Sequence, residues 1–159
     1  MQSSHDSNQV LASLSSADMA TVQTHLRFVE LPQETVLFEA GDSIGHVVFP
    51  HAGIVSLVVN LASGEMIEAA MIGREGVVGG LSALDTKVSV SRAVVQVAGA
   101  ASTLDVEHVR HLAEHSASFR ATLIRTSRSC RRSPSNPRPV SRCTPWRRAS
   151  RAGCCAAET

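Results

Sequence analysis

Between about residues 28 and 104 apolar side chains alternate with polar ones, and this pattern most constrains the fold. Short segments rich in Val and Ile repeat with a period of two, the period of half-buried β-strands. We expect such strands at residues 28–31, 34–38, 46–49, 54–59, 65–72, 91–97 and 101–104. Turns at Gly41, Gly53, Gly64 and Gly73 separate them at intervals of roughly ten residues, which is typical of an antiparallel sandwich or barrel.

Helical segments flank the strand region on both sides. A short helix or turn is expected at residues 8–14, and Ser15 to Asp18 form a capping cluster for a helix that ends near Leu26. After the strands, Asp105 is expected to cap a helix over 106–115, and a second helix begins near Ser116. Helices, about eight strands and then helices predict an α+β fold built around a jelly roll.

Three motifs, in this order and spacing, resemble the sensor domain of the Crp/Fnr family of bacterial transcription regulators. They are Val47-Val48-Phe49-Pro50 with Gly53-Ile54-Val55-Ser56-Leu57, then Met71-Ile72-Gly73-Arg74-Glu75-Gly76-Val77-Val78-Gly79, then Arg92-Ala93-Val94-Val95-Gln96-Val97. The resemblance covers about residues 8–125. It implies a cyclic-nucleotide-binding-like double-stranded β-helix, or jelly roll, flanked by short N- and C-terminal helices. Family members bind an effector inside the roll, pair through a long helix after it and read DNA with a C-terminal helix-turn-helix.

A glycine cluster marks one half of the expected effector pocket. Gly76, Gly79 and Gly80 follow a strand and precede Leu81, and bare backbone N–H groups at such glycines can approach a phosphate closely. In the cyclic-nucleotide binders that the chain resembles, a glutamate for the ribose hydroxyl stands at the position of Gly80. The glycines are also ordinary turn formers, and this alternative stays open.

The other half of the pocket is expected at Ser91, Arg92 and Ala93. The cyclic-nucleotide binders carry an Arg-Ser-Ala strand here for the cyclic phosphate, whereas this chain has the first two residues in inverse order. Because strand side chains alternate between faces, the shift by one residue turns Arg92 away from the roll interior. Ser91, Ala93, Val95 and Val97 then face inward. We therefore expect a small-molecule effector other than a cyclic nucleotide. The alternative for Arg92 is that it is a solvated strand residue without a role in binding.

No catalytic arrangement can be picked out, so we expect a binding protein without enzyme activity or cofactor. His108, His111 and His115 share one helical face, but no carboxylate or thiol accompanies them at metal-ligand spacing, which favours a solvated face over a metal site. The rival interpretations are a stand-alone interaction domain whose roll binds no small molecule and a cupin-type metal enzyme, also a jelly roll. A cupin needs a His-x-His pair, and the nearest candidates, His46 and His51, are five residues apart.

Charge and cysteine content divide the chain near residue 125. Residues 1–125 hold seven Lys and Arg against thirteen Asp and Glu, a net charge of −6, whereas residues 126–159 hold eight Arg and one Glu, a net charge of +7. All four cysteines lie in the second part. We expect residues 8–125 to form the sensor domain and residues 126–159 to be a disordered tail. The tail is explained by a frameshift or, in the alternative, by a basic arm that binds nucleic acid or anionic membrane.

Partners and location follow from the ends of the sensor segment. The first residues lack the basic and apolar regions of a secretory signal, which favours the cytoplasm and no membrane partner. No helix-turn-helix pattern follows residue 125, so we expect no sequence-specific DNA binding by this chain. Phe119, Leu123 and Ile124 lie where the family's pairing helix begins. They are expected to face water and to support at most a weak homodimer.

Overall fold

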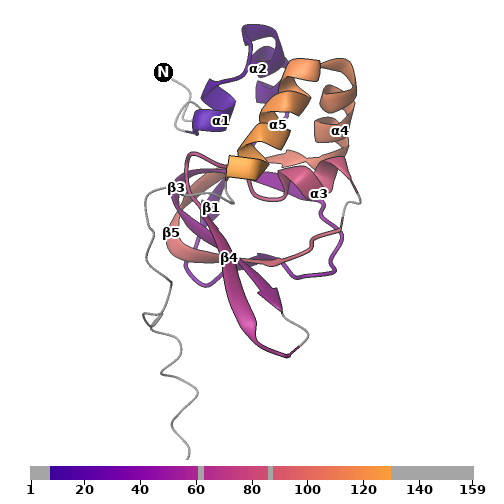
Figure 1. Ribbon diagram of the computed structural model, residues 1–159. Helices are drawn as coiled ribbons and strands as arrows, with labels where there is room; N and C mark the ends of the chain where they lie inside the picture. Colours follow the sequence, from indigo (N-terminus) through magenta and orange to yellow (C-terminus); the bar gives the residue numbers. More distant parts are fainter. Residues whose placement is uncertain (1–7, 61–62, 86–87, 130–159) are drawn as a thin grey trace, which may run out of the picture.

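The computed structural model describes residues 8–60, 63–85 and 88–129, and the statements below concern these residues. Their helices are α1 (Gln9–Ala12), α2 (Ser16–Gln23), α3 (Gly80–Leu84), α4 (Val106–His115) and α5 (Ala117–Ser129). Their strands are β1 (Arg27–Leu31), β2 (Val36–Phe38), β3 (His46–Asn60), β4 (Met66–Ile72) and β5 (Arg92–Asp105). The helices gather at one end of a rolled sheet, and the hairpin of β3 and β4 projects from the other end (Figure 1).

The two longest strands, β3 and β5, form the centre of the sheet. All strand pairs are antiparallel, in the order β1-β5-β3-β4, and β2 also pairs with β5. The beginning of β3 pairs with the end of β5, with His46 opposite Asp105, and the end of β3 pairs with the beginning of β5, with Val58 opposite Arg92. The sheet is a jelly-roll-like antiparallel roll with short helices, which confirms the predicted fold class.

Register shifts bend the long strands without ending them. Between Pro50 and Val55 the pairing of β3 with β5 is irregular at three places, as in β-bulges. Gly53 takes a φ of 87° there, and a Cβ atom on it would lie 2.5 Å from the carbonyl oxygen of Val97. The prediction of a turn at Gly53 between two strands is therefore wrong, because one bent strand replaces two. Likewise, the strands predicted at 91–97 and 101–104 are joined in β5.

The core lies between the roll and the helices, and α5 contributes to it. The largest fully buried side chains include Phe49, Phe119, Leu11, Ile72, Leu104 and Leu123. Phe119 and Leu123 belong to α5 and are 0% and 1% exposed, so the expectation that they face water is wrong. Burying one such side chain stabilises the fold by about 1.5–3 kcal/mol, which explains why α5 packs back on the domain. Ile124 is half-buried.

The N-terminal segment is fixed to the roll by Asn8, which is fully buried. Its Nδ2 donates to the carbonyl oxygens of Pro50 at 2.7 Å and Gly76 at 3.1 Å. Its Oδ1 accepts from the backbone N–H groups of Val10 and Leu11 and so caps α1. One side chain thus joins the first helix, β3 and the turn that precedes α3.

A second polar cluster joins α2 to α5. The Asp18 carboxylate accepts hydrogen bonds from the hydroxyls of Ser15 and Ser118, each at 2.8 Å. Hydrogen bonds from Ser15, Ser116 and Ser118 hold the pKa of Asp18 below its ordinary value of 3.8, because they stabilise the charged form. The N-terminal and C-terminal helices are therefore linked through an ionised carboxylate.

The helix boundaries agree with the sequence where a capping residue marks them. α4 spans the predicted residues 106–115, and Asp105 caps it by accepting from the N–H of Glu107 at 2.9 Å. α2 ends at Gln23, earlier than predicted, and α5 continues to Ser129, beyond the predicted boundary at 125. The predicted disorder of the tail concerns residues 130–159, which lie outside the described residues. Over the described ranges, no helix combines the length and apolar character that a membrane span needs.

Candidate functional site

The predicted glycine cluster lies in the turn that leads from β4 into α3. Gly76 is buried, its N–H donates to the carbonyl of Gly73 at 3.1 Å, and its own carbonyl accepts from Asn8. Gly79 precedes α3 with a φ of 82°, a conformation that side-chain-bearing residues rarely adopt. Gly76 therefore serves the turn itself, and its N–H is already bonded within the protein.

Gly80 begins α3 and is packed against the protein. A Cβ atom at this position would lie 3.1 Å from Cγ1 of Val77 and 3.6 Å from Cδ2 of Leu123. A glutamate here would therefore have to move the Val77 methyl groups or shift α3 away from α5. The next residue, Leu81, is 44% exposed. The small size of Gly80 thus permits the close contact between α3 and α5.

From Ser91 into the first part of β5, buried residues alternate with more exposed ones as predicted. Ser91 is 7% exposed, and Ala93 and Val95 are fully buried, which confirms that these three side chains face inward. Val97 is 48% exposed, so the same prediction is wrong for it. The reason is the register shift beside Ile54, the pairing partner of Val97, which interrupts the regular alternation of faces.

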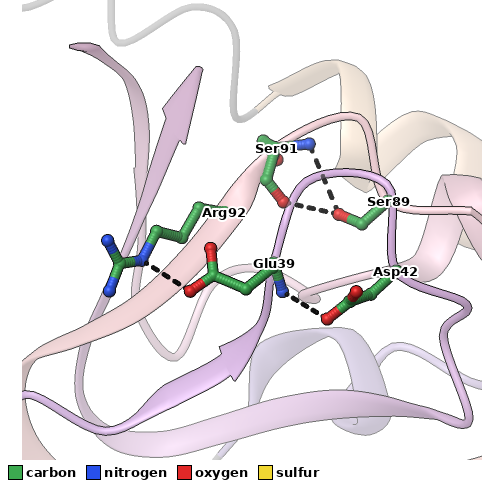
Figure 2. A network of polar contacts seen from close by, with 5 residues as sticks. All are labelled: Glu39, Asp42, Ser89, Ser91 and Arg92. Atoms are coloured by element: carbon green, nitrogen blue, oxygen red, sulfur yellow. Dashed lines mark hydrogen bonds and ion pairs between the residues drawn. The ribbon is translucent and has the colours of Figure 1, made fainter. Parts of the chain in front are cut away.

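Arg92 is held by an acidic residue that the sequence analysis missed. Its Nε lies 3.3 Å from Oε1 of Glu39, in the turn after β2, and Figure 2 shows the guanidinium beside that carboxylate. The contact is an ion pair without hydrogen-bond geometry. With side chains 38% and 53% exposed, it contributes about 0–1 kcal/mol to stability. The ion pair mainly orients the Arg92 side chain, because it holds the guanidinium beside the Glu39 carboxylate.

The segment before Arg92 is fixed to the turn after β2 by a network around Ser89 (Figure 2). The Ser89 hydroxyl donates to the carbonyl of Ser91 at 2.6 Å, its N–H donates to the carbonyl of Asp42, and its carbonyl accepts from Gly41. The Asp42 carboxylate in turn accepts from the N–H of Glu39 at 3.0 Å. The sequence predicted the turn at Gly41, but no sequence pattern indicated that this turn contacts the segment before Arg92.

The two halves of the predicted site share a neighbour in the segment from Phe38 to Ile44. A Cβ atom on Gly79 would lie 3.5 Å from the Ile44 side chain and 3.6 Å from the Phe38 ring. Phe38 is also the pairing partner of Ala93. The structure therefore brings the glycine turn and the Ser91–Arg92–Ala93 strand to one region of the roll.

The histidines of α4 are engaged with other rings. The His108 ring lies against His25 of the segment after α2 in a tilted arrangement, with ring centroids 3.9 Å apart, and His111 stacks on His115 at 4.3 Å. Across the described ranges, no group of three or more His, Cys, Asp or Glu side chains is arranged to hold a metal ion. These contacts pack His108 against the segment after α2 and His111 against His115.

His46 and His51, the candidates for a cupin-type metal site, make other contacts. His51 forms a hydrogen bond of 2.7 Å between its Nε2 and the Ser102 hydroxyl, and its ring stacks on Phe28. His46 begins β3 and lines a surface groove beside α4. The described residues therefore offer no metal-binding arrangement of the cupin type.

Solved structures share this fold at low sequence identity. The regulatory subunit of a cAMP-independent protein kinase A from Trypanosoma brucei, a mutant bound to cAMP in its A site, matches with a TM-score of 0.66, 15% identity and coverage of 81% of this chain and 45% of that chain. The N-terminal domain of a Streptomyces coelicolor transcriptional regulator matches with a TM-score of 0.60, 18% identity and coverage of 79% and 88%. The catabolite activator protein of Thermus thermophilus matches with a TM-score of 0.64, 18% identity and coverage of 76% and 56%. The chain thus spans about half the length of the first and third proteins.

A family profile gives the assignment. None of the curated protein sequences matches the chain. The profile of the cyclic nucleotide-binding domain matches residues 28–116, which is more than half of the chain. These residues run from β1 to the end of α4 and include the glycine turn and the strand that begins at Ser91. The chain belongs to the family of cyclic nucleotide-binding domains.

Proposed function

We propose that this chain is the effector-sensing domain of a Crp/Fnr-type transcription regulator, and that its effector is not a cyclic nucleotide. The observation that carries the second part is the placement of Arg92, which pairs with Glu39, while the buried position beside it is occupied by Ser91. A cyclic phosphate inside the roll needs a cation for charge-assisted hydrogen bonds. In this chain the inward residue is an uncharged serine.

The motifs and the neighbours support the regulator role. The Val47-Val48-Phe49-Pro50 motif and the glycine turn resemble the sensor domain of this family, and one structural neighbour is a catabolite activator protein. Another neighbour is the N-terminal domain of a transcriptional regulator. A regulator of this type acts in the cytoplasm. Residues 1–125 carry a net charge of −6, which opposes the phosphate backbone of DNA, so the proposal assigns them sensing and not DNA reading.

The trypanosome neighbour offers a comparison for the proposed test. Its kinase is described as cAMP-independent, and the form bound to cAMP carries three substitutions, one of which introduces an arginine.

The buried side chains at the beginning of β5 and just before it indicate the class of effector. They are Ser91, which precedes β5, and Ala93 and Val95 of β5. Ligand sites with mostly apolar walls and few polar groups take ligands of matching polarity. A neutral, partly apolar small molecule therefore fits this strand better than an anion.

Calorimetry with cyclic AMP and cyclic GMP tests the proposal on the full chain. We expect no measurable binding by the natural sequence. Binding should appear when Gly80→Glu is combined with the exchange Ser91→Arg and Arg92→Ser, because the exchange returns a cation to the inward face. Arg92→Ser alone is the matched control, since it frees Glu39 without adding the inward cation. Sub-micromolar affinity of the natural chain for either nucleotide would overturn the proposal, and a folded triple variant that binds neither would refute the assignment of these residues to the pocket.

A stand-alone interaction domain is the second candidate function. The observation that favours it is the exposure of apolar side chains on β4, where Met66, Ile67 and Met71 are 43%, 49% and 50% exposed. A thermal-shift screen with neutral metabolites separates the two candidates. A ligand that binds the roll raises the melting temperature in a concentration-dependent manner, whereas a pure interaction domain responds to none of them.

A further inference from the structure

A groove of about 480 Å³ lies outside the roll, where α2 ends and α4 begins. His25 after α2, Arg27 at the start of β1 and His46 at the start of β3 line it, together with Thr103 and Asp105 at the end of β5 and His108 of α4. The four cationic or imidazole side chains are exposed, so a solute can reach them. Three separate segments of the chain, at residues 25–27, at His46 and at His108, therefore contribute nitrogen-bearing side chains to the groove.

The charges in the groove are poorly neutralised by the protein. Among the residues that the structure describes, no carboxylate lies within ion-pair distance of Arg27. Asp105 is the acidic residue of the groove, and one of its oxygens is already engaged in capping α4 through the N–H of Glu107. Arg27 thus presents a permanent cation that no carboxylate of the described ranges neutralises at ion-pair distance.

The rings of His25 and His108, tilted by 31° with centroids 3.9 Å apart, line both this groove and a second hollow of about 610 Å³. The second hollow is also lined by Glu107, Arg110, His111 and Glu114, so two carboxylates line it, whereas Asp105 is the one carboxylate among the residues that line the first groove. The first groove, with Arg27, is therefore the better place for an anion.

We propose that the groove binds a small tetrahedral oxyanion, phosphate or a phosphate monoester, between Arg27 and the imidazole rings of His25, His46 and His108. Arginine matches the geometry of such an oxyanion, and imidazole N–H groups can donate further hydrogen bonds to it. The groove joins the end of α2 to the start of α4, so an anion there tethers these two elements. This site lies outside the roll and does not depend on the effector proposed above.

Titrations of the full chain followed by histidine side-chain NMR signals test the site. Sulfate is the first probe, because its charge is constant, and chloride at matched ionic strength is the control for screening. Inorganic phosphate and glycerol 3-phosphate then distinguish a site for the free anion from a site for a monoester. We expect saturable shifts of the His25 and His108 signals with sulfate and none with chloride.

Arg27→Gln is the decisive variant, and Arg120→Gln, an exposed arginine of α5 outside the groove, is its matched control. Loss of the Arg27 charge should weaken sulfate binding about tenfold or more, and loss of the Arg120 charge should leave it unchanged. Shifts that do not saturate, or equal behaviour of the two variants, would each overturn the proposal.

Discussion

Replacing Leu123 with alanine tests whether α5 belongs to the sensor domain or to a pairing surface. The substitution removes Cγ and both Cδ atoms from a side chain that is 1% exposed and that approaches Gly80 of α3. Leucine-to-alanine changes at such sites cost about 2–5 kcal/mol, since the cavity left behind adds to the lost burial. A domain of this size is stable by about 5–15 kcal/mol, so the loss is a large share of the total.

Thermal unfolding followed by circular dichroism measures this loss. Taking about 3 kcal/mol and about 4 °C per kcal/mol, we expect the Tm to fall by about 12 °C. The matched control is Ile124→Ala, the neighbouring residue, whose half-buried side chain should cost about 1 kcal/mol. Sedimentation of both variants shows whether association changes. A similar small fall in Tm for both variants, together with a loss of dimer in Leu123→Ala alone, would refute the packing of α5 in the core and restore the pairing surface.

Three further predictions concern the frame around the site. Gly99→Ala should destabilise the domain by about 3 kcal/mol or more in urea unfolding, because a Cβ atom there would overlap the carbonyl group of Ala52, whereas Gly45→Ala, in open space, should change stability by less than about 1 kcal/mol. Asn8→Ala should cost about 2–4 kcal/mol in the same assay, since it removes a helix cap and leaves two buried carbonyls without their donor. The pKa of Asp18 is lowered, so its contribution to stability is complete above pH 3.8 and disappears as the pH falls through the lowered value; Asp18→Asn should flatten the acid limb of the stability profile.

The sequence predicted those features that depend on neighbours along the chain. The alternation of apolar residues and the capping residue Asp105 led to the jelly roll and to the bounds of α4, because period and capping are local properties. The break between strands at Gly53 was wrong, since glycine marks a turn and a bulge alike, and only the partner strand decides between them. The same ambiguity applied at Gly99 in β5.

Features that depend on contacts between distant segments could not be predicted from the sequence. The glutamate that pairs with Arg92 lies before it in another turn, and no local pattern connects the two. The faces of α5 were assigned by analogy with a pairing helix, and the packing of Leu123 close to Gly80 could not be read without knowing where α3 lies. For the site, the inverse order of Ser91 and Arg92 predicted that Arg92 turns away from the roll interior, but its pairing with Glu39 required the structure.

The pairing of β1 with β5 has a consequence for how the chain is made. Arg27 lies opposite Thr103, and the two residues are 76 positions apart. At about 5–20 residues per second, a ribosome makes the second partner about 4–15 s after the first. During that time β1 has emerged without the strand that completes its backbone hydrogen bonds, and an open strand edge attracts other chains. The nascent protein is therefore most exposed to aggregation until β5 is complete, and slower translation between the two strands lengthens that interval.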